Sequence, residues 1–286
     1  MKRLLIVGVS LALVALVLQG CSRTTSTEIK GSDTMVNLGN AWAEAFRAEH
    51  PGVSISVTGG GSGVGIAALI NGDTDIAESS REMKQEEKDQ AKKAGLDPQE
   101  FVVAKDGLSV IVNQRNSVAK LTIDQLADIY TGRITNWKDI GGKDEQIVVL
   151  SRDKSSGTHV FFLEHVLRKG NSKGTEEYAN TVLMQVSSQS IADEVAQNTS
   201  AIGYVGMGYV DAVRHKAIAV AKDAESPFVE PTTENVLNET YPIARPLYLY
   251  TPKSPEGTVK DFIDFALSDE GQKIVEKIEF VPIKAL

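Results

Sequence analysis

Three short loops rich in glycine and hydroxyl side chains limit the folds open to this chain. They span residues 31–34, 59–63 and 152–158, and each lies between a strand pattern and a helical pattern. A hydroxyl at a helix N-terminus, beside glycines that let backbone N–H groups approach, forms a receptor for an anion. Three such loops, one of which carries Arg152, predict a single oxyanion held from several sides.

The order of elements along the chain indicates the fold class. Residues 28–30, 53–57, 147–150, 201–205 and 247–250 have strand patterns, and 37–49, 64–70, 123–130, 158–167 and 259–267 have helical ones. This alternation predicts an α/β protein with mostly parallel sheets and a ligand at the carboxyl ends of the strands. All three loops fall at such strand-to-helix turns.

The N-terminus resembles a lipoprotein signal. Lys2 and Arg3 precede an apolar run over residues 4–18, which is shorter than the roughly 20 residues of a transmembrane helix. Residues 18–21 then read Leu-Gln-Gly-Cys, similar to a lipobox, so we expect a signal peptide over 1–20, lipidation at Cys21 and a tether over 21–27. The alternatives are a non-cleaved anchor, or an ordinary signal with a chance cysteine.

Charge and cysteine content exclude several classes of partner. The formal net charge is −8, and −10 once Lys2 and Arg3 are removed, which argues against nucleic acid or an anionic membrane surface. Cys21 is the single cysteine, so neither an intramolecular disulfide nor a thiolate metal site can form. About 266 residues remain after the signal, enough for one large or two modest domains.

Other chemistries lack their motifs. The loop over 59–63 matches neither the dinucleotide fingerprint nor a P-loop nor a Gly-x-Ser-x-Gly elbow. The four histidines have no metal-ligand spacing and are expected mostly on the surface. Ser156 and His159 could be read as a nucleophile and base, but a coincidence at a helix start is the simpler reading. We expect no enzyme activity, metal or cofactor.

The chain resembles the phosphate-binding proteins of high-affinity phosphate ABC transporters over nearly its whole mature length. The most specific stretches are Tyr-Thr-Gly-Arg-Ile-Thr-Asn-Trp at 130–137 and Arg-x3-Ser-Gly-Thr at 152–158. Further matches are residues 31–34, 61–63, 75–81, 201–205 and 269–272. The resemblance implies a type II periplasmic-binding-protein fold, with lobe 1 over 28–106 plus 250–286 and lobe 2 over 107–249. The crossing segments are expected near 106–113 and 241–250.

The resemblance also implies a site. The groups expected to hold phosphate belong to Thr34, Met35, Ser62, Ser80, Arg152, Ser156, Gly157 and Thr158, with Ser32 and Asp33 as further candidates. Many members of the family carry, where Ser80 stands, an aspartate that accepts the proton of bound phosphate. Either Ser80 or Asp33 would take that role here. Arg81 is expected to support a loop rather than to touch the ligand.

Several readings stay open beside this one. Thr34 and Ser62 could be simple helix N-caps, and Arg152 could pair only with Asp153. Three functions follow: a monomeric, lipid-anchored phosphate receptor that delivers to ABC permease subunits outside the cytoplasm; a receptor of the same fold for sulfate, molybdate or tungstate; and a secreted phosphoester hydrolase.

Overall fold

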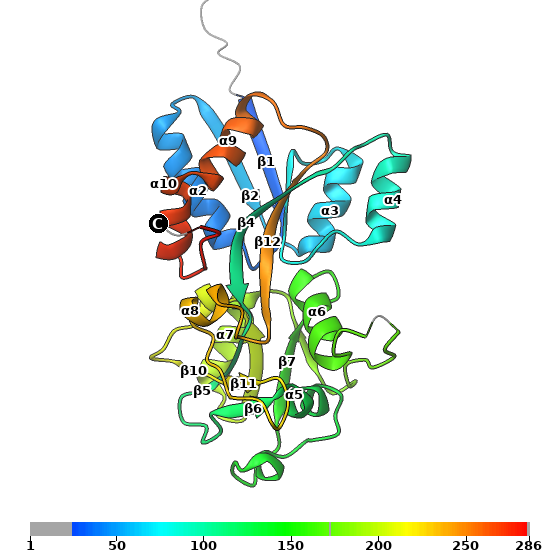
Figure 1. The fold of residues 1–286 in the computed structure, drawn as a ribbon, viewed down its shortest axis with the longest axis vertical. Helices are drawn as coiled ribbons and strands as arrows, with labels where there is room; N and C mark the ends of the chain where they lie inside the picture. Colours follow the sequence, from blue (N-terminus) through cyan, green and yellow to red (C-terminus); the bar gives the residue numbers. More distant parts are fainter. Residues whose placement is uncertain (1–24, 172, 285–286) are drawn as a thin grey trace, which may run out of the picture.

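The computed structural model describes residues 25–171 and 173–284, which form two α/β lobes stacked along the long axis of the molecule (Figure 1). Cys21 and the signal lie outside the described residues. Within the described part, no helix combines the length and apolarity needed to cross a bilayer.

Lobe 1 is built on a five-stranded sheet with helices on both faces. The strands, in spatial order, are β2 (Val53–Thr58), β1 (Thr25–Gly31), β3 (Ile76–Ser79), β12 (Ala244–Thr251) and β4 (Gln99–Gly107). The helices of one face are α2 (Val36–Glu49), α9 (Gly257–Leu267) and α10 (Asp269–Lys277). On the other face lie α3 (Ser62–Asn71) and α4 (Gln85–Lys93). Both termini of the described chain therefore belong to lobe 1.

Lobe 2 has a second five-stranded sheet and a small two-stranded one. The large sheet runs β10 (His215–Ala217), β5 (Ser109–Asn113), β9 (Ala201–Val205), β7 (Val148–Arg152) and β8 (Leu183–Gln185), and the small one pairs β11 (Ala219–Ala221) with β6 (Lys120–Thr122). Its α-helices are α5 (Ile123–Tyr130), α6 (Gly157–Phe162), α7 (Ser188–Gln197) and α8 (Thr233–Leu237). Shorter turns are η1 (Trp137–Ile140), the π-helical η2 (Leu163–Leu167) and η3 (Met207–Tyr209).

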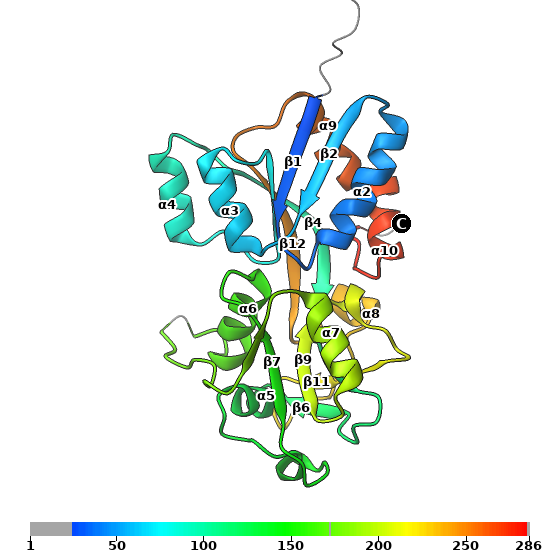
Figure 2. The ribbon, with the colours of Figure 1, turned by 180° about the vertical axis from the view of Figure 1, so that it is seen from behind.

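Two strands connect the lobes. β4 leaves lobe 1 and continues into β5, while β12 returns beside β4, as both views show (Figures 1 and 2). The two strands are antiparallel, with Arg245 directly opposite Asp106. β5 is likewise antiparallel to β9 and β10. The sheets are therefore mixed, with parallel pairing kept between β1, β2 and β3 and between β7, β8 and β9.

The parallel strands bring the predicted loops to the boundary between the lobes. β1 and β2 end facing lobe 2, as does β3, which is parallel to β1, and β7 ends facing lobe 1. Packing behind these strands fixes the loops: Leu38, Trp42 and Phe46 of α2, spaced four residues apart, are buried. Each such side chain stabilises the fold by about 1.5–3 kcal/mol through burial.

Some elements differ from the sequence prediction. β1 begins at Thr25, because residues 25–27 pair with 53–55 of β2, so the predicted tether loses its last three residues to the sheet. β12 is longer than predicted, because its charged Arg245 is paired inside the sheet. α10 was not predicted. His159 and His215, expected on the surface, are buried with ring nitrogens hydrogen-bonded to the carbonyls of Arg152 and Ala192.

Candidate functional site

The first loop places Thr34 at the boundary between the lobes. Thr34 is buried, and its Oγ1 lies 2.8 Å from Oγ1 of Thr158 in lobe 2. It does not cap α2, whose N-cap is Met35 without a side-chain hydrogen bond. The simple N-cap reading of Thr34 is therefore wrong. The side chain of Met35 is buried in the core, and its backbone N–H donates to the Ser32 carbonyl at 3.0 Å.

The second loop presents Ser62 as the first residue of α3. Its Oγ accepts from the backbone N–H of Ser80 at 3.0 Å and lies 3.4 Å from Ser80 Oγ. The Ser62 hydroxyl accepts a hydrogen bond from the backbone after β3 and does not cap α3, so the N-cap interpretation is wrong here as well. Gly65 sets the position of the helix: a Cβ there would lie 2.4 Å from the Lys30 carbonyl, so α3 sits directly on the β1 backbone.

The third loop begins α6 in lobe 2. Ser156 is the N-cap of α6, and its Oγ accepts from the N–H groups of Thr158 and His159. The Ser156 hydroxyl proton stays available as a donor. Gly157 faces lobe 1 at close quarters: a Cβ on it would meet Ser62 Oγ at 2.2 Å and Ser80 Oγ at 2.8 Å.

Four hydroxyls thus converge from both lobes, and we call Thr34, Ser62, Ser80 and Thr158 the hydroxyl cluster. Ser80 Oγ lies 3.5 Å from Thr158 Oγ1, which closes the chain of contacts from Ser62 to Thr34. All four residues are at most 1 % exposed. Buried hydroxyls that can each donate or accept form a site suited to a small oxyanion.

Arg152, at the end of β7, is held by several acceptors, one of which is Asp33, the neighbour of Thr34 in the chain. Its Nη1 donates to Asp33 Oδ2 and to Ser188 Oγ, each at 3.0 Å, while Nε and Nη2 reach the carbonyls of Gln185 and Val186. Asp153 is farther away, with 3.8 Å between the charged atoms. The reading of Arg152 as a simple partner of Asp153 is therefore wrong, because its main ion pair is with Asp33.

Asp33 links the two lobes. Its Oδ2 accepts from Arg152 and, at 2.7 Å, from the backbone N–H of Ser188 at the start of α7, and its carbonyl accepts from the Tyr209 hydroxyl at 2.7 Å. The neighbouring Ser32 has a buried Oγ without a partner among the described residues.

Sequence reasoning missed two charged residues next to the hydroxyl cluster, Arg245 and Asp106. Arg245 donates from Nε and Nη2 to Asp106 Oδ2 at 3.0 and 2.8 Å, and its Nη2 also donates to Thr158 Oγ1 at 3.1 Å. Both side chains are at most 1 % exposed. A signal was present: one arginine and one aspartate, each inside an apolar strand run and each at an expected crossing.

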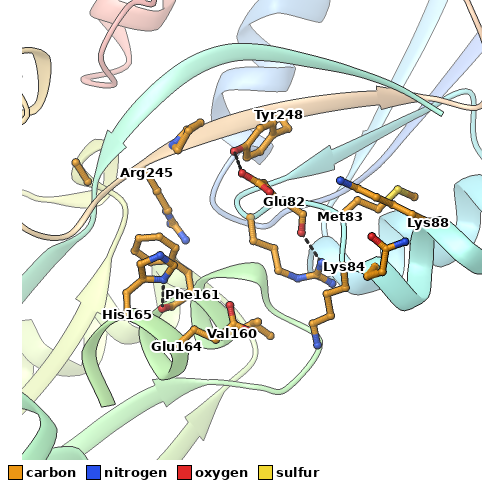
Figure 3. A pocket seen from close by; sticks show the side chains of 14 residues that line it. Glu82, Met83, Lys84, Lys88, Val160, Phe161, Glu164, His165, Arg245 and Tyr248 are labelled. Carbon is orange, nitrogen blue, oxygen red and sulfur yellow. Dashed lines mark hydrogen bonds between the residues drawn. The ribbon is translucent and has the colours of Figure 1, made fainter. Parts of the chain in front are cut away.

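Arg245 also borders an open pocket of about 590 Å³ between the lobes (Figure 3). In that view Arg245 reaches from β12 towards Phe161 of α6, and its guanidinium carbon is 5.4 Å from the centre of that ring. Lys84 and Lys88 lie across the pocket. Arg81 pairs with Glu87 at 2.7 Å, which confirms that it supports its loop.

The geometry offers no nucleophile–base pair at Ser156. The Nδ1 atom of His159 faces the Arg152 carbonyl at 2.8 Å and Ser151 Oγ at 3.2 Å, not Ser156 Oγ. Burial lowers the pKa of His159. Within residues 25–171 and 173–284, no group of three or more His, Cys, Asp or Glu side chains is arranged to hold a metal ion.

Comparison with known proteins gives a consistent picture. The PBP superfamily domain matches residues 21–270. Phosphate-binding protein PstS of Pseudomonas aeruginosa is 32% identical over 272 residues, covering 89% of this chain and 82% of that one. The same-named protein of Staphylococcus saprophyticus is 34% identical over 266 residues, covering 90% and 80%.

A solved structure is similar along its whole length. It is a putative phosphate ABC transporter substrate-binding protein with bound phosphate from Clostridium perfringens, 39% identical with a TM-score of 0.81, and the match covers 91% of this chain and 100% of that one. An ABC-type phosphate transport receptor from Vibrio cholerae is 32% identical with a TM-score of 0.71, covering 89% and 99%.

Proposed function

The chain belongs to the phosphate-binding proteins of the PBP superfamily, and from this premise we propose how it works: it binds inorganic phosphate outside the cytoplasm and delivers it to the permease of an ABC importer. The observation that carries the proposal is the buried hydroxyl cluster, to which both lobes contribute. A ligand held there bridges the lobes, so binding and closure are one event.

The anion is held by donors rather than by surplus charge. Thr34, Ser62, Ser80 and Thr158 supply hydroxyls, while Ser156, the backbone N–H of Gly157 and the arginine Arg152 complete the set; Ser32 adds its unpartnered hydroxyl. The backbone N–H of Met35 joins them when it exchanges the Ser32 carbonyl for the anion. Each hydrogen bond to a charged group contributes about 1.5–3 kcal/mol, and micromolar affinity requires about 8 kcal/mol, so this set exceeds the requirement before the cost of closure.

Transport, rather than catalysis, is the activity that this arrangement favours. Ser156 Oγ accepts from the N–H groups that start α6, and His159 is engaged elsewhere. We therefore propose that the protein is not an enzyme. The lipobox-like residues 18–21 support a lipid on Cys21 that holds the protein at the outer face of the membrane, and the resemblance to phosphate receptors supports a monomer.

Calorimetry with the purified full-length protein tests the function. We expect one phosphate per chain, with sulfate, molybdate and tungstate binding more weakly. If one of these anions binds more tightly than phosphate, the alternative receptor is correct. Turnover of a chromogenic phosphoester that survives repeated purification would favour the hydrolase.

A further inference from the structure

Two buried arginines flank the hydroxyl cluster, and they differ in what they contact. The Nη1 atom of Arg152 reaches Asp33 and Ser188, at the side of the cluster. Arg245 has a donor aimed at the cluster itself, because its Nη2 donates to Thr158 Oγ1 at 3.1 Å. That oxygen is 2.8 Å from Thr34 Oγ1, so the guanidinium of Arg245 lies one hydrogen bond from the centre of the site.

Asp106 determines where this guanidinium points. Its Oδ2 accepts from both Nε and Nη2 of Arg245, and its Oδ1 accepts from the backbone N–H of Met207 at 2.9 Å. A two-bond contact between a carboxylate and an arginine fixes the orientation of the planar group. The remaining Nη1 donates to the backbone carbonyl of Ser80 at 3.1 Å, so Arg245 contacts one residue of the cluster in each lobe.

We propose that Arg245 is a binding residue for the anion, and that Asp106 is a positioning residue that aims Arg245 and cancels its charge. This inference rests on the proposed function and names a further determinant of the same site. An oxygen of a tetrahedral oxyanion takes the place of Thr158 Oγ1 as acceptor for Nη2. Thr158 is then free to donate to the same anion.

The pair also bears on which anion is preferred. The negative charge of Asp33 balances the positive charge of Arg152, and Asp106 balances Arg245 in the same way. The site therefore attracts an anion through hydrogen-bond donors and carries no net positive charge from these two pairs. A surplus positive charge would favour the sulfate dianion over the phosphate monoanion H2PO4⁻, which carries one negative charge less. Ser80, a serine at the end of β3, offers no carboxylate for the proton of phosphate. Asp106 therefore contributes to rejecting sulfate by limiting the positive charge.

The alternative is that the pair acts only as a strut between β4 and β12. The double variant Arg245→Gln/Asp106→Asn separates the two roles, because it removes both charges together and leaves no unpaired buried charge. Arg214→Gln/Asp193→Asn is the matched control, since it makes the same changes at an exposed pair 2.9 Å apart on lobe 2. Inorganic phosphate is titrated into each purified full-length protein by calorimetry, with circular dichroism as the check of folding.

We expect the double variant to lose at least about thirtyfold in phosphate affinity, because it loses a charge-assisted contact with the anion. The control should stay within about twofold of the wild type. A folded double variant that binds like the control overturns the proposal. Should the double variant not fold, Arg245→Lys decides: it keeps the charge but not the fork, and affinity equal to that of the wild type overturns the proposal. Wild-type protein that does not bind phosphate overturns the proposed function itself.

Competition with sulfate distinguishes the charge-balancing role of Asp106 from a purely structural one, because only the first changes the ratio of the two affinities. Asp106→Asn leaves Arg245 unbalanced. Below the second pKa of phosphate, where the monoanion dominates, the sulfate dianion should therefore gain on phosphate by at least about fivefold in relative affinity. A strut would change the affinity for both anions by the same factor. An unchanged ratio in folded Asp106→Asn overturns the positioning and charge-balancing role.

Discussion

Asp33 Oδ2 lies 3.0 Å from Arg152 Nη1, and this ion pair joins a loop of lobe 1 to the end of a lobe 2 strand. The same oxygen accepts from the Ser188 N–H at the start of α7, where a negative charge is favourable. The carboxylate therefore belongs to the contact between the lobes, and it faces Arg152 rather than the hydroxyl cluster.

Asp33→Asn should weaken phosphate and sulfate binding equally, by about tenfold, because it destabilises the closed form without altering the acceptors around the anion. Calorimetry with both anions measures this, and small-angle scattering reports the extent of closure. Asp153→Asn is the control, since Asp153 is 3.8 Å from Arg152. A change in the phosphate-to-sulfate ratio would instead show that Asp33 accepts the proton of phosphate.

Gly157→Ala should abolish closure. The added methyl group would lie 2.2 Å from Ser62 Oγ, which is too close for the lobes to meet as they do. We expect phosphate affinity to fall at least about a hundredfold while the melting temperature without ligand changes little, because the added methyl group meets serine side chains rather than the hydrophobic core. Ser254→Ala on an exposed loop is the control. Retained affinity would mean that the lobes do not close on this surface.

Glu78 should make stability depend on pH. It is fully buried on β3, without a hydrogen-bond partner among the described residues, and burial raises its pKa from 4.5 to about 8. The native state therefore holds a proton that the unfolded chain releases near pH 4.5. The resulting stabilisation is complete below that pH and is lost as the pH rises through about 8.

We therefore expect the melting temperature of the wild type to fall between pH 5 and 9, and Glu78→Gln to fall less, because the amide cannot ionise. Thermal unfolding across this range measures it, with the exposed Glu86→Gln as control. Parallel profiles for Glu78→Gln and the wild type would contradict the assignment.

The strand–loop–helix order was enough to predict the α/β class, because glycine and hydroxyl loops at strand ends are local signals. The type II fold was expected only from the resemblance to the family. The order of elements did not predict the buried pair of Arg245 and Asp106, since two charges 139 positions apart become partners only through the β4–β12 pairing. The contact of Asp33 with Arg152, 119 positions apart, likewise forms only when the two lobes meet. Local propensity carries no information about which distant charge will neutralise which.

Cys21 lies outside the described residues, and its lipidation stays a prediction. A protein that carries two acyl chains binds membranes stably, whereas a protein with a single acyl chain binds only marginally. Cys21→Ser should release the protein from the membrane fraction or block its processing, which fractionation and mass spectrometry detect. Ser22→Ala is the control. A Cys21→Ser protein that is processed to the same size and stays with membranes would contradict lipid anchoring.

A crystal structure of the protein grown with phosphate tests the central claim most directly. We expect one phosphate between the lobes, with oxygens within hydrogen-bond distance of Thr34, Ser62 and Thr158, and with Arg152 alongside. Phosphate bound elsewhere, such as in the open pocket beside Lys84 and Lys88, with the hydroxyls of the two lobes still in mutual contact, would contradict the account.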